Sequence, residues 1–284
     1  MKDEIKLYYA VLNNMGDLLN VLIIRDLFGF QVERRSFLTG EMTAIGSGLG
    51  QYTLHGSLPM KLQQLLNGFR YPEVWVWGTG FIDYAEKDQP FFKRGMRFCA
   101  VRGELSRRRA EKLLGRRLDI PTGDAGILAS ELIDVPAEKT WDVGVVPHIC
   151  DINEPSAADL AGAFENSILI DLREDPYEVL RKIAACRVII SSSLHGLIAA
   201  DSFGIPNRHV LLSDKPKGDG FKFDDYYSAY GVPHLCTDLR YGGKITLREI
   251  EESYPITREM ALEKKKAMLA CFPFDTVKPV KELK

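Results

Sequence analysis

The stretch that decides the fold is Val188-Ile-Ile-Ser-Ser-Ser-Leu-His-Gly-Leu-Ile-Ala-Ala-Asp-Ser-Phe-Gly-Ile-Pro-Asn207. Its apolar residues 188–190 predict a short buried strand. The residues from 194 onward predict a small-residue amphipathic helix that ends at Gly204-Ile-Pro206, where proline cannot continue it. The first N–H groups of such a helix have no partner within it and point outward with the positive end of the dipole. Together with Ser191 to Ser193 and His195, this helix start predicts a site for a small anion beside a proton-transfer group.

Strands and helices alternate on both sides of this stretch. Strands are expected at 5–12, 30–35, 44–45, 74–77, 96–101, 141–147, 167–171, 188–190 and 210–212, and helices at 18–28, 58–69, 103–114, 157–165, 175–186 and 257–272. Strands separated by helices of roughly 10–15 residues are typical of a parallel, doubly wound sheet. We therefore expect an α/β fold of two Rossmann-like halves with mostly parallel sheets, at 1–138 and 139–255. A solvated helical tail at 256–284 can pack back across either half.

Composition narrows the class of protein. The chain has 284 residues, of which 45% are hydrophobic and 27% are charged, and its formal net charge is −2. These values fit an ordinary globular protein and give no reason to expect nucleic-acid or membrane binding from overall charge. The five cysteines lack a disulfide or zinc spacing, the charged start is unlike a signal peptide, and no apolar run reaches membrane-spanning length. We expect a cytoplasmic protein without a resident metal and without a nucleic-acid partner.

Glycine or small polar residues follow four of the expected strands. They occur in Asn14-Met-Gly-Asp17, Gly46-Ser-Gly48, Gly78-Thr-Gly80 and Ser191-Ser-Ser193. Ligands of open parallel sheets bind at the carboxyl ends of the strands, so the four loops together predict one lined cleft. The alternative is that each glycine only serves its own turn. None of the loops has the spacing of a dinucleotide or P-loop motif, which disfavours a nicotinamide cofactor.

Three side chains are candidates for chemistry in this cleft. Arg102 follows a strand and opens a helix, where its guanidinium can clamp a carboxylate or phosphate; the alternative is a surface arginine in a basic helix. His195, at the helix start, is the first acid–base candidate, against the alternative of a structural histidine. His148 is the second, with Asp151 close by in sequence. The remaining histidines, expected to be structural or on the surface, are His55, His209 and His234.

One further segment suits a sugar. Residues 217–230 read Lys-Gly-Asp-Gly-Phe-Lys-Phe-Asp-Asp-Tyr-Tyr-Ser-Ala-Tyr and so combine aromatic rings with carboxylates. Aromatic faces stack on the C–H faces of a sugar, while polar groups bind its hydroxyls. On this interpretation Lys222, Asp225 and Tyr226 contact the sugar. On the alternative one, a glycine-rich loop enters a helix whose aromatic residues belong to the core.

In these motifs the chain resembles the polysaccharide pyruvyl transferases. The resemblance is carried by Asn14-Met-Gly-Asp17, Gly46-Ser-Gly48, Gly78-Thr-Gly80, Arg102-Gly-Glu-Leu-Ser106, Gly123-Asp-Ala-Gly126, Ser192-Ser-Leu-His-Gly196, Gly204-Ile-Pro-Asn207 and Phe221-Lys-Phe-Asp-Asp-Tyr-Tyr227. It implies a GT-B-like arrangement with a cleft between the halves. It also implies transfer of the pyruvyl group of phosphoenolpyruvate to two hydroxyls of a sugar, giving a cyclic ketal and phosphate. The acceptor would be a lipid-linked repeat unit or a wall or exopolysaccharide glycan.

The candidate residues can be given roles in this chemistry, the donor contacts from the resemblance and the catalytic and acceptor roles from the chemistry of the side chains. The donor would be held by Arg102, Ser192, Ser193, Leu194 and His195. His195 is the leading catalytic group, because one side chain with a pKa near neutrality can serve both proton transfers. Further catalytic candidates are His148 and Asp17, and acceptor contacts are expected from Asn14, Asp17, Asp151, Lys222, Asp225 and Tyr226. The reaction needs no cofactor besides its donor and no metal.

Two other functions stay open. A GT-B-type glycosyltransferase needs a nucleotide-sugar site in the second half, for which residues 144–148 are the one candidate. A sugar-binding or scaffolding protein with a decayed site predicts that changing His195 or Arg102 has no effect. A lipid-linked acceptor would bring the protein transiently to the inner membrane surface, with Arg107 to Arg117 as a candidate contact; the alternative is that this stretch is a solvated helix.

Overall fold

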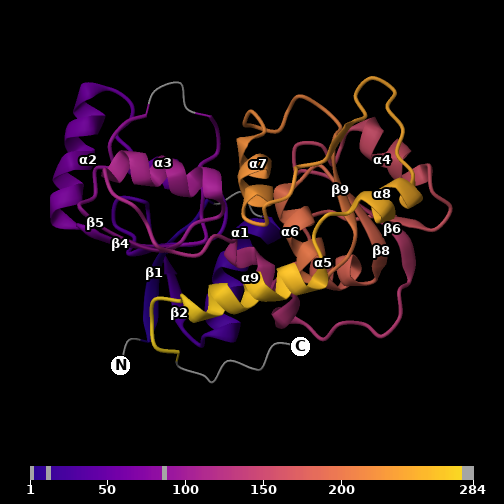
Figure 1. The fold of residues 1–284 in the computed structure, drawn as a ribbon, viewed down its shortest axis with the longest axis horizontal. Helices are drawn as coiled ribbons and strands as arrows, with labels where there is room; N and C mark the ends of the chain where they lie inside the picture. The colour runs from indigo at the N-terminus through magenta and orange to yellow at the C-terminus, as the bar shows by residue number, and fades with distance from the viewer. Residues whose placement is uncertain (1–2, 11–13, 85–87, 277–284) are drawn as a thin grey trace.

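The computed structural model describes residues 3–10, 14–84 and 88–276, and in them it forms two five-stranded sheets (Figure 1). The strand orders are β2-β1-β3-β4-β5 and β10-β9-β8-β6-β7, with all neighbours parallel. The strands are β1 (Glu4–Tyr8), β2 (Gln31–Arg34), β3 (Met42–Thr43), β4 (Glu73–Trp77), β5 (Gly95–Ala100), β6 (Trp141–Val146), β7 (Ser167–Leu169), β8 (Cys186–Ser191), β9 (Asn207–Leu211) and β10 (Cys236–Asp238). The predicted α/β class with two Rossmann-like halves is confirmed.

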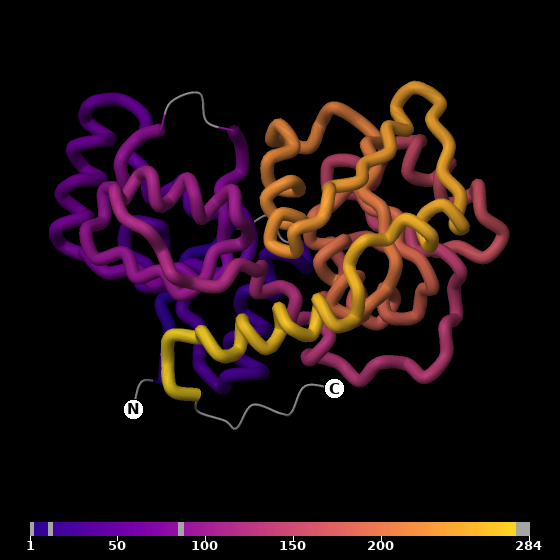
Figure 2. Tube along the Cα trace, viewed as in Figure 1, coloured from indigo at the N-terminus to yellow at the C-terminus, as the bar shows by residue number. Residues whose placement is uncertain are grey.

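Helices connect the strands and cover the sheets. The α-helices are α1 (Met15–Leu22), α2 (Leu58–Arg70), α3 (Glu104–Leu114), α4 (Pro155–Gly162), α5 (Pro176–Ala184), α6 (Leu194–Ser202), α7 (Phe221–Ser228), α8 (Leu247–Ser253) and α9 (Arg258–Ala270). A π-helical turn, η1 (Ile23–Leu27), continues α1, and η2 (Leu49–Tyr52) and η3 (Ala125–Leu132) are 3₁₀. Among the described helices, none is both long and apolar enough to cross a membrane. The halves lie side by side, as expected for a GT-B-like arrangement, and α9 runs from the second half back along the first (Figure 2).

Local sequence explains where α5 begins and which face it buries. The Asp175 carboxylate caps the helix by accepting hydrogen bonds from the N–H groups of Tyr177 and Glu178, and Pro176 occupies the first turn. Val179, Leu180 and Ile183 recur at helical spacing and are all buried. Capping and periodicity therefore agree, and the predicted helix at 175–186 is observed.

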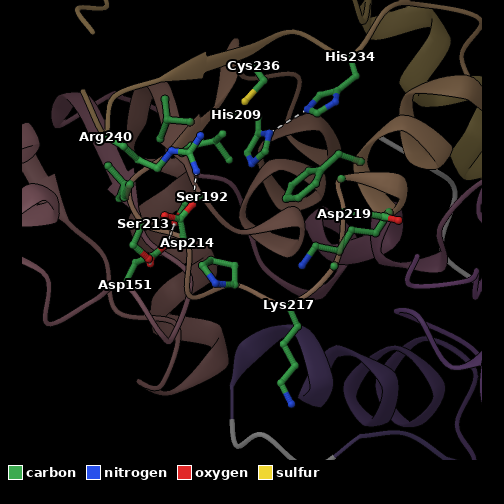
Figure 3. A pocket seen from close by; sticks show the side chains of 18 of the residues that line it. Asp151, Ser192, His209, Ser213, Asp214, Lys217, Asp219, His234, Cys236 and Arg240 are labelled. Atoms are coloured by element: carbon green, nitrogen blue, oxygen red, sulfur yellow. Dashed lines mark hydrogen bonds and ion pairs between the residues drawn. The ribbon is translucent and has the colours of Figure 1, made fainter. Parts of the chain in front are cut away.

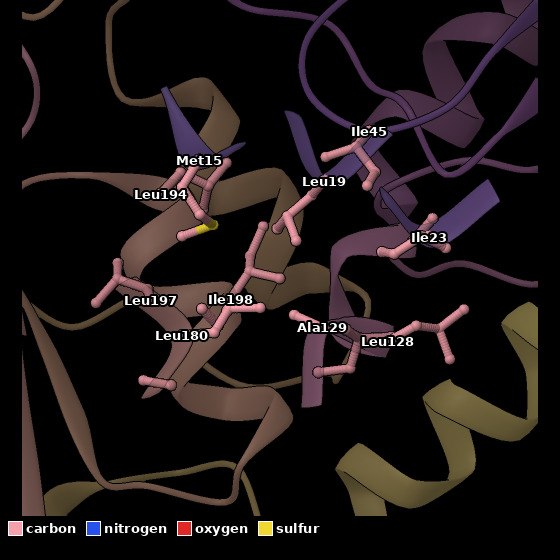
Figure 4. Close-up of a cluster of buried hydrophobic side chains, with 14 of the residues drawn as sticks. Met15, Leu19, Ile23, Ile45, Leu128, Ala129, Leu180, Leu194, Leu197 and Ile198 are labelled. Carbon is pink, nitrogen blue, oxygen red and sulfur yellow. The ribbon is translucent and has the colours of Figure 1, made fainter. Parts of the chain in front are cut away.

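The largest hydrophobic core belongs to both halves. Met15 and Leu19 of α1 lie in one cluster with Leu194, Leu197 and Ile198 of α6, and all five side chains are at most 5% exposed (Figure 4). The backbone N–H of Met15 also donates to the carbonyl of Leu172, with an N···O distance of 2.7 Å. The junction between the halves is therefore packed as densely as an interior.

The helix α6 is not amphipathic, contrary to the prediction. All of its residues are buried except His195, which is partly exposed. The reason is its position: it contacts β8 and β9 of its own half and also η3 and α1 of the first half. A helix covered on every side has no solvent face to show in its sequence. The small residues of α6 instead allow close packing.

The tail helix α9 is more buried than the solvated helix predicted from the sequence. Lys265 is buried and donates to the Ser130 hydroxyl at 2.6 Å and to the Glu131 carboxylate at 2.9 Å. The indole N–H of Trp77 donates to the carbonyl of Met268 at 3.0 Å. The helix α9 therefore ties the end of the second half to the sheet of the first.

Other predictions of secondary structure differ at the edges of the sheets. The strand β3 occupies Met42–Thr43 and so ends before the predicted 44–45. The strand β10 and the helix α8 lack a clear apolar pattern and were not predicted. Residues 11 and 12 of the first expected strand, and 277–284 of the expected tail, lie outside the described residues.

Candidate functional site

The candidate site begins where β6 and β8 end side by side. Val146 pairs with Ser191 in the register of the two strands, so the residues that follow each strand are neighbours. The backbone N–H of His148 accordingly donates to the Ser192 hydroxyl at 2.8 Å. The Ser191 hydroxyl donates to the carbonyl of Val146 at 2.7 Å and accepts from the Ser193 N–H at 3.0 Å. These bonds shape the turn that leads from β8 into α6.

A buried carboxylate holds this turn in place. The Ser192 hydroxyl donates to Asp151 at 2.6 Å, and the Ser213 hydroxyl donates to the other oxygen of the same carboxylate at 2.5 Å. Asp151 is fully buried. The structure thus brings Asp151 and Ser192 together, with the carboxylate bridging two loops of the second half.

His195 projects from the first turn of α6 into the junction between the halves. A Cβ on Gly16 of α1 would lie 1.9 Å from its Nδ1, and a Cβ on Gly46 would lie 3.9 Å from its Nε2. The ring therefore occupies space that two glycines of the first half leave open. Among the described residues its buried Nε2 has no hydrogen-bond partner. Such a nitrogen can bind a ligand or exchange a proton with one.

Positive charge gathers around this imidazole. Burial, and then the charges of Lys222, Arg102 and His148, lower the pKa of His195 to about 3. Burial, and then Arg102, lower the pKa of Lys222 to about 8, against an opposing effect of nearby anionic groups. Burial and Lys222 also lower the pKa of His148. Lys222 makes protonation of both imidazoles less favourable, and a bound anion would relieve that repulsion.

Arg102 and Asp225 form an ion pair that links the two halves. Both side chains are fully buried, and Nε of Arg102 lies 2.9 Å from the carboxylate of Asp225. The other guanidinium nitrogens donate to the carbonyl of Gly46 at 3.2 Å, the Ser47 hydroxyl at 2.8 Å and the carbonyl of Phe81 at 2.5 Å. A direct clamp on a ligand, as predicted for Arg102, would require it to release Gly46 and Ser47. In this structure the guanidinium supplies charge and connects the halves.

The remaining predicted residues lie in two different places. Asn14 caps α1, accepting from the Asp17 N–H at 3.2 Å and donating to the Asp17 carboxylate at 2.9 Å. Both residues flank Gly16, so they lie at the junction near His195. Tyr226 is fully buried, and its hydroxyl donates to Asp201 at 2.7 Å. The structure therefore places Asn14 and Asp17 at the site and Tyr226 in the core behind it.

A cavity of about 340 Å³ opens in the second half beside these residues (Figure 3). The predicted residues Asp151, Ser192 and Lys222 belong to its lining. His209, His234 and Cys236 belong to it as well and form a separate group in Figure 3. The cavity thus joins the predicted site to a second cluster of polar side chains.

Two features of this region were missed in the sequence. Asp124 is fully buried, its Oδ2 has no partner among the described residues, and burial raises its pKa to about 6. The motif Gly123-Asp-Ala-Gly126 pointed to it, but no role was assigned. The cluster of His209, His234 and Cys236 had no signal in residue spacing. It arises because Cys236 pairs with His209 in the register of β9 and β10.

Comparison with known proteins identifies relatives of the chain. The sequence profile of the family named polysaccharide pyruvyl transferase matches residues 37–214. Uncharacterized protein L143 of Acanthamoeba polyphaga mimivirus is 34% identical over 117 residues, which cover 40% of this chain and 41% of that protein. Succinoglycan biosynthesis protein ExoV of Rhizobium meliloti (strain 1021) is 32% identical over 100 residues, which cover 35% of this chain and 27% of that protein. The chain thus matches less than half the length of either relative.

Proposed function

Because the chain belongs to the polysaccharide pyruvyl transferase family, we propose that it transfers the pyruvyl group of phosphoenolpyruvate to a glycan sugar. Two hydroxyls of the sugar would be bridged as a cyclic ketal, with release of phosphate. The observation that carries the proposal is that the positive charges of Lys222 and Arg102 act on the neutral imidazole of His195 at the start of α6. Phosphoenolpyruvate is a small anion with both a carboxylate and a phosphate, and positive charges beside a helix start are a fitting receptor.

In this proposal His195 acts first as an acid and then as a base. Its depressed pKa keeps it neutral in the free protein, and the negative charges of the donor raise that pKa so that the imidazole takes up a proton. The proton passes to the methylene carbon of phosphoenolpyruvate, which leaves an oxocarbenium ion at the neighbouring carbon. A sugar hydroxyl adds there and returns its proton to His195.

The second stage closes the ketal. Phosphate leaves with the electrons of its C–O bond, so the same carbon again becomes an oxocarbenium ion. The second hydroxyl adds to it, and its proton leaves with the phosphate through His148. The two hydroxyl protons thus account for the new methyl hydrogen and for the proton on phosphate. No cofactor besides the donor is required in this scheme.

We assign the acceptor sugar to the cavity. Its lining combines the side chains of Asp151 and Lys222 with the ring of Phe223, a set that suits the hydroxyls and C–H faces of a sugar. Asn14 and Asp17 would orient hydroxyls from the first half. Asp225 and Tyr226, which lie behind this surface, act as positioning residues for α7.

The biological setting follows from this assignment. The relative named for succinoglycan biosynthesis supports a role in making an exopolysaccharide or another cell-surface glycan. Since phosphoenolpyruvate is a cytoplasmic metabolite, we place the reaction in the cytoplasm. A lipid-linked acceptor would bring the protein transiently to the inner membrane surface, without a nucleic-acid partner.

Thermal denaturation with phosphoenolpyruvate, compared with UDP, GDP, CMP and NAD at matched concentrations, tests the proposal. A ligand at about 100 times its dissociation constant adds about 2.7 kcal/mol, which raises the melting temperature by a few degrees for a chain of this size. We expect a shift with phosphoenolpyruvate alone, lost in His195→Gln and kept in the control His55→Gln. Release of phosphate that depends on a glycan acceptor would then establish the transfer.

One observation supports a second candidate, a GT-B-type glycosyltransferase that uses a nucleotide-sugar. The cavity in the second half is lined by the rings of His209, Phe223 and His234. These rings provide flat surfaces on which the nucleobase of a nucleotide-sugar can stack. A shift with a nucleotide and none with phosphoenolpyruvate would favour this candidate and contradict the first. If glycan binding were unchanged in both His195→Gln and Arg102→Lys, the chain would be a sugar-binding protein with a decayed site.

A further inference from the structure

We propose that His209, His234 and Cys236 form a binding site for a divalent transition metal, preferentially Zn²⁺. One ligand atom from each residue lies within 4.8 Å of the other two. Nδ1 of His209 and Nε2 of His234 are 2.9 Å apart. Zinc prefers thiolate and imidazole ligands, whereas magnesium and calcium prefer oxygen ligands.

The sheet itself assembles these ligands. In the parallel pairing of β9 with β10, Cys236 lies opposite His209. His234 precedes Cys236 by two residues and approaches from the loop before β10. Two ligands therefore come from adjacent strands and the third from a short connection, so the ligand positions are set by backbone pairing.

The imidazole of His234 is already oriented for a metal. Its Nδ1 lies 2.8 Å from the carboxylate of Asp224, to which it donates, and this leaves the lone pair of Nε2 directed at His209. A carboxylate that holds the far nitrogen of a ligating histidine is a common second shell of zinc sites. The ring of Phe223 stacks on His209 with centroids 3.7 Å apart and restricts its plane.

The spacing needs only a small adjustment to hold the ion. In a tetrahedral site with Zn–N distances of about 2.0–2.1 Å, two imidazole nitrogens lie about 3.3 Å apart. The observed separation of 2.9 Å is that of a hydrogen bond in which Nδ1–H of His209 donates to Nε2 of His234. Binding of the ion replaces this bond, moves the proton of His209 to its Nε2 and widens the separation by about 0.4 Å. Cys236 is exposed, which gives an ion a path to the cluster.

Three protein ligands leave one coordination position for an oxygen of a molecule in the cavity. All three residues line that cavity, together with Asp151 and Lys222. The cluster includes none of the residues assigned to pyruvyl transfer, so the scheme for transfer remains metal-free. Metal binding is measured without donor or acceptor, so its outcome is independent of the proposed function.

Titration with Co²⁺, followed by competition with Zn²⁺, tests the site on the full chain. We expect one ion per chain, a thiolate-to-cobalt charge-transfer band in the near ultraviolet and the visible bands of tetrahedral cobalt. Cys236→Ser should abolish the charge-transfer band, and the control Cys150→Ser, which changes another exposed cysteine, should keep it. Asp224→Asn should weaken binding about 10–100-fold.

The folded state of each variant is verified by circular dichroism, so that loss of binding is not mistaken for loss of structure. Absence of a charge-transfer band in the folded wild-type protein would overturn the proposal. A band of equal strength in Cys236→Ser would overturn it too.

A second, independent observation concerns α2, whose apolar side chains face away from the protein. The helix buries Gln64 and Gly68, and a Cβ on Gly68 would lie 2.3 Å from the carbonyl oxygen of Phe92. Its large apolar side chains are instead 40–80% exposed, namely Leu58, Met60, Leu62, Leu65, Leu66 and Phe69. A stripe of this kind is typical of a helix that binds another surface.

We infer that this apolar face of α2 binds an anionic membrane. The helix α2 contains Lys61 and Arg70 and no acidic residue, and the guanidinium of Arg94 lies over the ring of Phe69, 4.3 Å from its centroid. An apolar face bordered by basic side chains matches the headgroup region of anionic lipids. The helix also lies at the outer end of the first half, away from the second (Figure 1).

The basic stretch predicted from the sequence is less suited to this contact. Arg107 pairs with Glu104 at 2.6 Å, and Arg109 pairs with Asp88 at 2.9 Å. These arginines are already neutralised by carboxylates of the protein itself. The inferred contact therefore moves from α3 to α2.

Co-sedimentation with vesicles tests the inference. We expect binding to phosphatidylcholine vesicles that contain phosphatidylglycerol, weaker binding to phosphatidylcholine alone, and loss of binding in the double variant Leu62→Ser, Leu66→Ser. The control Tyr241→Ser removes a side chain that is 81% exposed in the second half, and it should bind like wild type.

Two outcomes would contradict the membrane inference. The first is equal vesicle binding by the wild type and the double variant. The second is a concentration-dependent dimer in ultracentrifugation that the double variant abolishes, since the face would then contact a second copy of the chain. The thermal shift with phosphoenolpyruvate should be unchanged in the double variant, so failure here is distinguishable from failure of the proposed function.

Discussion

At the scale of single residues, Gly16 positions His195 by having no side chain. Gly16→Ala would place a Cβ 1.9 Å from Nδ1 of His195 and so displace the ring. A misplacement of about 1 Å in a catalytic group costs on the order of 10²-fold in rate, so we expect a loss of that size in kcat. Steady-state kinetics measure it, with Gly162→Ala as control, because no atom lies within 4 Å of that added Cβ. Equal kcat values in the two variants would contradict the assigned role.

The burial of His195 predicts how stability depends on pH. Its pKa falls from 6.5 to about 3 on folding, so the unfolded state binds more protons between these values and stability decreases as the pH is lowered. By pH 5 this one group destabilises the protein by about 2 kcal/mol relative to neutral pH. Urea unfolding of wild type and His195→Gln at several pH values measures the effect. The wild type should lose about 2 kcal/mol more stability than His195→Gln between pH 7 and pH 5, and parallel curves would refute the assignment.

Residues that follow directly from strand-to-helix patterns were predictable. Ser192 follows an apolar run and His195 lies in the first turn of the next helix, so both are placed near a strand end without further information. The buried partner of Arg102 was not predictable, because Asp225 is distant in the sequence and meets it only across the junction. The same holds for the contact between Gly16 and His195, since sequence patterns report local geometry and not which halves meet.

At the scale of elements, the ion pair of Arg102 and Asp225 connects the start of α3 to α7. Asp225→Ala removes the carboxylate that accepts from Arg102 and from Ser106, and it leaves a buried guanidinium without its counter-charge. Breaking a buried pair in this way costs about 3–5 kcal/mol. Denaturant unfolding measures the loss, and we expect the variant to be destabilised by that amount.

An exposed ion pair provides the matched control. Glu252→Ala breaks the pair with Arg248. The side chains of Arg248 and Glu252 are 85% and 62% exposed, so the loss should cost less than about 1 kcal/mol. If the two variants were destabilised equally, the pair of Arg102 and Asp225 would not be the link inferred here.

Elements were predictable where capping and periodicity agree, as in α5, and where an apolar run is long enough, as in β8. The strand β10 and the helix α8 were missed, because three strand residues with alternating exposure and a short charged helix carry little pattern. The prediction that α6 is amphipathic was wrong for a physical reason. Its contacts with the first half bury the face that an amphipathic helix would expose, and those contacts exist only in the folded protein.

At the scale of the whole molecule, the shared core predicts that the two halves unfold together. Met15 and Leu19 from one half and Leu197 from the other are fully buried in the same cluster, so neither half keeps its core when the other unfolds. Calorimetry should show a single transition, and Leu197→Ala should lower its midpoint without splitting it. A truncation of Leu to Ala in a core costs about 2–5 kcal/mol. Two resolved transitions would show that the halves are separate folding units.

For the proposed transferase, the same junction limits how new acceptor specificities can be engineered. A chimera that joins the first half of one relative to the second half of another would combine an α1 and an α6 that were never selected for each other. Mismatched volumes there would strain or hollow the centre of the protein, and the ring of His195 would lose the opening that Gly16 provides. Recombination of such enzymes should therefore exchange the surface loops around the cavity and leave both faces of the junction from one parent.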